Sequence, residues 1–137
     1  MKHLKADFKD KTVIAEELDR LHDKTVAFNE IDPKHIYLEA STPDTPIKEV
    51  HLFSAENIEK CYRIYKKTSN SKALKLSYYE TGDFKEDFSG FKLEIVDFYY
   101  SVYDIFIYGA TKNEKGYYDS DFVIVIPDIE TVDIVYR

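Results

Sequence analysis

The C-terminal half of the chain consists largely of residues that favour β-strands. From Tyr78 onward, aromatic and branched residues are interleaved with carboxylates, and this segment holds nine of the twelve tyrosines. Residues 76–137 contain thirteen Asp and Glu against five Lys and Arg. The negative charge of this segment alone is therefore larger than the net charge of −7 of the whole chain. The pattern predicts an acidic, tyrosine-rich sheet.

Two connections inside this half have the composition of turns. The residues Asn113 to Gly116 suit a hairpin in which Gly116 takes a positive φ, and Ser89-Gly90 suits a turn or bulge. Pro127 ends a strand. Alternation of apolar residues predicts strands over residues 26–29, 36–40, 50–53, 73–80, 91–96, 99–110, 117–126 and 129–136.

Two short helices are predicted in the N-terminal half. In the first, over Thr12 to Asp23, the residues Ile14, Leu18 and Leu21 recur at helical spacing. The second begins at Ser54, a favoured N-cap residue. Its apolar stripe would consist of Ile58, Cys61, Tyr62 and Tyr65, with Lys66 and Lys67 at its C-terminal end.

These elements together predict a single α+β domain over residues 1–137. The length suits one hydrophobic core, and 44% hydrophobic residues are too many for a disordered chain. We expect two short helices packed on a twisted, mostly antiparallel sheet of about five to seven strands.

Cysteine usage and the termini indicate where the protein resides. Cys61 is the one cysteine, which excludes an intrachain disulfide and favours a reducing compartment, so we predict a cytoplasmic protein. The charged N-terminus does not look like a signal peptide, and the apolar run from Phe122 to Pro127 is too short to span a bilayer. Neither export nor membrane insertion is expected. Oligomeric state is left open, with a homodimer among the alternatives.

The acidic sheet favours a noncatalytic binding protein. Tyrosine offers a large contact area with few rotatable bonds, and carboxylates steer a basic partner into place. We therefore expect an inhibitor that neutralises a basic, nucleic-acid-handling protein, in the manner of immunity proteins and phage-encoded inhibitors. The expected partner-binding residues are Asp97, Tyr99, Tyr103, Asp104, Tyr117, Tyr118, Asp119 and Asp121.

A basic segment gives the alternative function. Residues 48–75 contain seven Lys and Arg against three Glu, and basic groups beside tyrosines can follow a phosphate backbone while stacking on bases. The residues of this nucleic-acid or nucleotide site would be Tyr62, Arg63, Lys66, Lys67 and Lys72. A third alternative is an enzyme or small-ligand site with an aromatic pocket.

Catalytic and metal signatures are weak, and no cofactor is predicted. Asp119 and Asp121 have the spacing that places two carboxylates on one side of a strand, but a solvated strand end is the favoured interpretation. The same holds for the acidic turn that contains Glu80, Asp83, Glu86 and Asp87. The four histidines are not spaced as metal ligands; they are His3, His22, His35 and His51. Cys61 is expected to be a packed apolar residue unless His35 or His51 approaches it.

Overall fold

The computed structural model describes residues 2–55, 63–68, 76–80 and 90–137. Over these residues the chain forms one α-helix, one short 3-10 turn (Asp19–Leu21) and ten strands. In chain order the elements are β1 (His3–Asp7), α1 (Lys11–Leu18), β2 (Thr25–Asp32), β3 (His35–Ala40), β4 (Ile47–Ser54), β5 (Arg63–Thr68), β6 (Leu76–Glu80), β7 (Lys92–Tyr100), β8 (Ile105–Lys112), β9 (Tyr118–Ile126) and β10 (Ile129–Tyr136).

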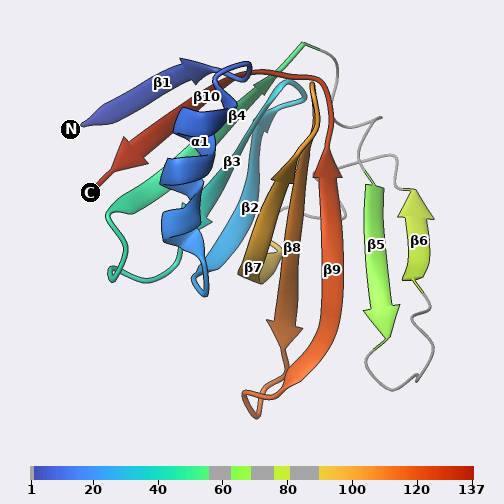
Figure 1. Ribbon diagram of the computed structural model, residues 1–137. Helices are drawn as coiled ribbons and strands as arrows, with labels where there is room; N and C mark the ends of the chain where they lie inside the picture. Colours follow the sequence, from blue (N-terminus) through green and yellow to red (C-terminus); the bar gives the residue numbers. More distant parts are fainter. Residues whose placement is uncertain (1, 56–62, 69–75, 81–89) are drawn as a thin grey trace.

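All ten strands belong to one sheet with the order β1-β10-β4-β3-β2-β7-β8-β9-β5-β6. Every pairing in the sheet is antiparallel. Helix α1 lies against one face, and both chain ends lie on the β1–β10 side (Figure 1). The last strand therefore returns beside the first, although the two are separated by the whole length of the chain.

The predicted architecture of two helices on five to seven strands is wrong. The first helix is found, with Ile14, Leu18 and Leu21 buried as their spacing predicted. The end of the second predicted helix is instead strand β5, and residues 56–62 of that helix lie outside the described residues. The strand count exceeds the prediction because β1 was not foreseen and because β5 lies where the end of a helix was predicted. The predicted strand over 99–110 is interrupted at 101–104, so its first residues belong to β7 and its later ones to β8.

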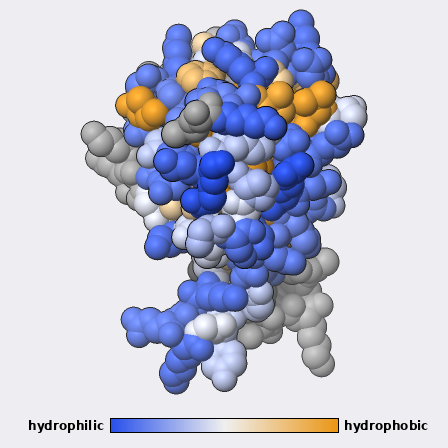
Figure 2. Space-filling view, turned by 90° about the vertical axis from the view of Figure 1, so that its left-hand side faces the viewer, coloured by the Kyte–Doolittle hydropathy of each residue, from blue (hydrophilic) through white to orange (hydrophobic). Residues whose placement is uncertain are grey.

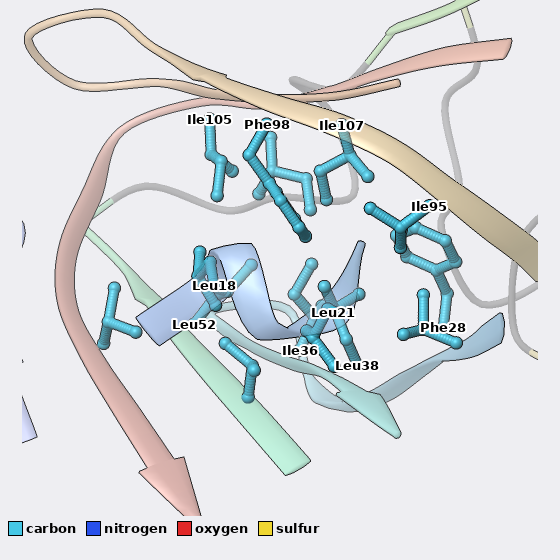
Figure 3. Close-up of a cluster of buried hydrophobic side chains, with 14 of the residues drawn as sticks. Leu18, Leu21, Phe28, Ile36, Leu38, Leu52, Ile95, Phe98, Ile105 and Ile107 are labelled. Atoms are coloured by element: carbon cyan, nitrogen blue, oxygen red, sulfur yellow. The ribbon is translucent and has the colours of Figure 1, made fainter. Parts of the chain in front are cut away.

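The core lies between α1 and the sheet. Leu18 and Leu21 of the helical segment lie between side chains from the two halves of the sheet (Figure 3). One half contributes Ile36, Leu38 and Leu52, and the other contributes Ile95, Phe98, Ile105 and Ile107. Because both halves bury apolar side chains against the same short helix, the sheet has to curve around it.

The opposite face of the sheet carries the alternate residues of each strand. On β3 and β4 these include His35, Tyr37 and His51, which are half-buried. On β7 and β8 they include the exposed Tyr99 and Tyr108. Their rings pack edge to face, with 4.9 Å between the ring centroids. The side of the molecule that carries β1 is largely hydrophilic, with separate hydrophobic spots (Figure 2). A hydrophilic edge disfavours pairing of β1 with another chain.

Strand β10 is tied to α1 by a hydrogen bond whose loss at high pH can be measured. Tyr136 Oη donates to Glu17 Oε2 at 2.6 Å. Burial and this hydrogen bond raise the pKa of Tyr136 to about 12. The folded-state pKa is above the ordinary value of 10.0, so the contribution to stability is complete below pH 10 and is lost as the pH rises from 10 to 12.

We therefore expect Tyr136→Phe to reduce the decline in stability between pH 10 and 12. At pH 8 the variant should be less stable by about 1 kcal/mol, because the hydrogen bond is gone. Urea denaturation at pH 8 and pH 11 measures both effects. Tyr117→Phe, at an exposed hairpin position, is the control and should match wild type. A Tyr136→Phe protein with the wild-type alkaline decline would contradict the assignment.

Candidate functional site

A pocket of about 450 Å³ opens at the end of the sheet where three connections meet. These connections are the segment from β1 to α1, the turn between β7 and β8, and the start of β10, all at the upper end of the molecule in Figure 1. The residues that line it are Asp7, Phe8, Lys9, Val102, Tyr103, Ile129, Glu130 and Thr131. We call it the end pocket.

Backbone hydrogen bonds hold the three connections together. Phe8 N donates to Glu130 O at 2.8 Å, and Ile129 N donates to Tyr103 O at 2.8 Å. The 101–104 turn is closed by Ser101 N donating to Asp104 O at 2.9 Å. These bonds fix the pocket walls relative to one another, although the walls come from distant parts of the sequence.

Side chains complete the turn beside the pocket. Ser101 Oγ accepts a hydrogen bond from Asp104 N at 3.1 Å, and Asp104 Oδ1 accepts one from Asp128 N at 3.2 Å. Asp128 has a φ of 57°, a left-handed conformation that Asp tolerates better than most residues. Asp104, predicted as a partner contact, therefore also holds the β7–β8 and β9–β10 turns together.

The end pocket is apolar at its base and acidic at its rim. Phe8 and Ile129 are buried, whereas Tyr103 is 62% exposed. Asp7 and Glu130 are exposed carboxylates. Residues 7–11, 104 and 128–130 together contain five carboxylates and two lysines, so the region is locally negative.

A lysine of the chain itself already occupies one corner of this region. Lys11 Nζ lies 3.5 Å from the centre of the Phe8 ring and donates to Phe8 O and, at 3.2 Å, to Val102 O. Burial lowers the pKa of Lys11. A ring face and two carbonyl oxygens thus satisfy an ammonium group here, which shows that the chemistry of this corner suits a cation.

The predicted partner contacts do not form one patch. Tyr103 lines the end pocket and Asp104 is the next residue of the same turn, whereas Tyr117 and Tyr118 lie at the β8–β9 hairpin. Strand β8, with its eight residues, separates the two groups by roughly 25 Å. The others lie on β7 and β9: Asp97, Tyr99, Asp119 and Asp121.

Two of the predicted contact tyrosines away from the pocket, Tyr99 and Tyr118, have partners within the chain. Tyr118 Oη donates to Glu94 Oε1 at 3.0 Å, and Lys112 Nζ lies 3.1 Å from Glu94 Oε2. The hydrogen bond to Glu94 is the main cause of the raised pKa of Tyr118. The neighbouring Asp97 carboxylate raises the pKa of Tyr99. Both rings are exposed, so they remain accessible to a partner while they hold these contacts.

The two carboxylate motifs are described by the structure only in part. Asp121 is half-buried and lies opposite Ala110 in one ladder and Lys67 in the other. Glu80 ends β6, and Asp83, Glu86 and Asp87 lie outside the described residues. Within the described ranges, no group of three or more His, Cys, Asp and Glu is arranged to hold a metal ion.

The alternative nucleic-acid site was predicted on a helix, and this premise is wrong for its described residues. Arg63, Lys66 and Lys67 belong to strand β5, where Arg63 and Lys67 occupy positions of one parity and Lys66 the other. The helical spacing on which the predicted basic face depended therefore does not apply to these three residues. Tyr62, Lys72 and Cys61 lie outside the described residues.

The fold pairs two histidines that sequence spacing left apart. His35 Nε2 and His51 Nδ1 are 2.7 Å apart, and His51 Nε2 lies 3.0 Å from Glu49 Oε1. The two histidines are sixteen residues apart and meet across the neighbouring strands β3 and β4, so a spacing of three or four residues could not reveal the pair. The available signal was the alternation of the two strands: His51 lies on the predicted strand 50–53, and His35 directly precedes the predicted strand 36–40, at the same alternate positions as the outward Tyr37.

The helical segments in the part of the chain that the structure describes are too short to cross a membrane. Comparison of the chain with protein-family models, with curated proteins and with solved structures finds no significant match.

Proposed function

We propose that this chain is a noncatalytic binding protein that neutralises a basic protein partner, and that the end pocket receives a lysine or arginine side chain of that partner. The observation that carries the proposal is the pocket itself, in which an exposed tyrosine and two carboxylates surround a buried apolar base. The nearby cation site formed by Phe8 and two carbonyl oxygens supports the same chemistry.

The pocket suits the two parts of a basic side chain. The aliphatic stem of lysine or arginine would lie on Phe8 and Ile129, and its charged end would reach Asp7 or Glu130. Tyr103 would cover the guanidinium or ammonium group with its ring. A partner that handles nucleic acids presents such side chains where it binds phosphate, so an acidic protein seated there blocks the phosphate site.

The partner is unidentified, so the test uses a panel of arginine-rich and lysine-rich peptides. We expect Tyr103→Ala with Glu130→Lys to weaken binding at least about thirtyfold, the effect of losing a central aromatic contact. Tyr117→Ala with Glu114→Lys makes the same changes at exposed positions of the far hairpin and should keep the wild-type affinity. Fluorescence anisotropy at low and high salt measures both, and the association rate should fall with salt.

Three results would contradict the proposal. Loss of binding in the hairpin variant alone would move the working surface to the β8–β9 hairpin. Equal loss in both variants would show that only overall charge matters. Wild-type protein that captures none of the basic peptides but retards RNA or single-stranded DNA in a gel would favour nucleic-acid binding instead.

A further inference from the structure

The outer face of β3 and β4 carries a chain of three hydrogen-bonded side chains, Glu49, His51 and His35. The contacts are 3.0 Å from Glu49 Oε1 to His51 Nε2 and 2.7 Å from His51 Nδ1 to His35 Nε2. Phe53 stacks on His35 at 4.1 Å, and Tyr37 stacks on His51 at 4.9 Å. The stacking restricts how far either imidazole can turn away from the other.

The carboxylate fixes where the protons are. An ionised Glu49 can only accept, so His51 Nε2 carries hydrogen and the neutral ring leaves a lone pair on Nδ1. The 2.7 Å contact then requires His35 Nε2 to donate to His51 Nδ1. His35 Nδ1 is consequently the nitrogen that takes the first additional proton.

We propose that the hydrogen-bonded group of Glu49, His51 and His35 is a proton-operated switch. It stays closed when the first proton binds and opens when the second proton binds. The first proton, on His35 Nδ1, leaves both hydrogen bonds in place. The second proton, on His51 Nδ1, puts hydrogens on both facing nitrogens, and two positive rings cannot remain 2.7 Å apart. The pair therefore separates.

The surroundings of the pair act on His35 in opposite directions. Burial and the neighbouring His51 lower the pKa of His35, while Asp32 and Asp133 oppose this shift. Repulsion within the pair then holds the second proton off to lower pH. The ionisable groups around the pair are Glu49 on β4, Tyr37 and Glu39 on β3, Asp32 before β3, Asp133 on β10, and His3 on β1, which lies 3.3 Å from Asp133.

Opening of the pair would act on the end pocket through one neighbouring residue. Phe53, which stacks on His35, lies opposite Thr131 in the β4–β10 ladder, and Thr131 lines the pocket. This link to binding rests on the proposed function, whereas the titration of the histidine pair does not. We expect basic peptides to bind less tightly once the second proton is bound.

Nitrogen-15 NMR of the histidine rings from pH 8 to pH 4 tests the switch. We expect two titration steps, separated by more than about one pH unit, and both rings should report both steps. In His35→Gln, the amide can still donate to His51 Nδ1 but takes no proton, so only one of the two titration steps should remain. His22→Gln, at an exposed site that is not part of the Glu49–His51–His35 group, should leave the pair unchanged. Independent single steps for His35 and His51 in wild type would overturn the proposal.

Two further measurements test the proposal even if a histidine variant folds poorly. Glu49→Gln keeps both histidines but no longer dictates the His51 tautomer, so the Nε2-protonated share should fall at pH 8. An unchanged tautomer would overturn the assignment. The backbone amide of Thr131 should shift only with the second step. A second step without any change at Thr131 or in peptide affinity would refute the link and leave the pocket proposal standing.

Discussion

Gly109→Ala should destabilise the fold by about 3 kcal/mol or more, a large effect for one added methyl group. A Cβ atom at this position would lie 2.4 Å from Leu93 Cγ and 2.6 Å from the backbone oxygen of Glu94. The leucine can rotate, but the carbonyl belongs to strand β7, directly beside β8. Relief therefore requires the two central strands to separate, which breaks their hydrogen bonds.

The control separates this steric requirement from the general cost of replacing glycine. Gly116 has a φ of 83° and no atom within 4 Å of a built Cβ, and asparagine tolerates that φ. Gly116→Asn should cost less than about 1 kcal/mol. Thermal denaturation should show a fall of roughly 10 °C for Gly109→Ala and little change for Gly116→Asn. A Gly109→Ala protein as stable as wild type would mean that β7 and β8 are not packed this closely.

Local patterns predicted those elements whose neighbours agree with them. Residues 36–40 and 129–136 alternate apolar and polar residues, and the structure places strands β3 and β10 there. Gly116 has the positive φ expected of the hairpin. In these segments, intrinsic preference and long-range pairing favour the same structure.

The second helix failed because its pattern was ambiguous. Tyr65, with Ile58 and Tyr62, fits a helical stripe, yet Ile64 and Thr68 are equally good strand residues. The segment Arg63–Thr68 pairs with β9 on one side and β6 on the other. Two hydrogen-bonded neighbours outweigh a weak helical preference, and neither neighbour can be seen in a local window of sequence.

The end pocket could not be predicted from the sequence, because it also depends on long-range contacts. Val102 and Tyr103 are strand-type residues, so the segment read as one strand from Tyr99 to Ala110. The chain turns there because Ser101 and Asp104 close a turn and because Tyr103 O receives a hydrogen bond from Ile129 N. The prediction identified Tyr103 and Asp104 as candidate contacts but could not place them beside Phe8 and Glu130. The pairing of His35 with His51 was not predicted for the same reason, because it forms between two neighbouring strands.

Leu18→Ala is the second substitution from which we expect a large loss of stability. Among the described residues, one helical segment covers this face of the sheet, and its Leu18 is fully buried between the two halves of the sheet (Figure 3). Truncation would leave a cavity lined by Leu52 and other core residues that are held in place by the hydrogen-bonded sheet. Because the strands cannot collapse into that space, we expect a cost of about 3 to 4 kcal/mol in urea denaturation.

The matched control lies on the same helix. Val13 is 43% exposed, and alanine is the better helix former, so Val13→Ala should change the free energy of unfolding by less than about 0.5 kcal/mol. The contrast distinguishes burial from helix preference, because both substitutions introduce alanine into the same eight-residue helix. Similar small effects of both variants would show that α1 is only loosely attached to the sheet. Since Phe8 and Lys11, which connect α1 to the end pocket, would then also be poorly held, that result would weaken the structural basis of the proposed binding site.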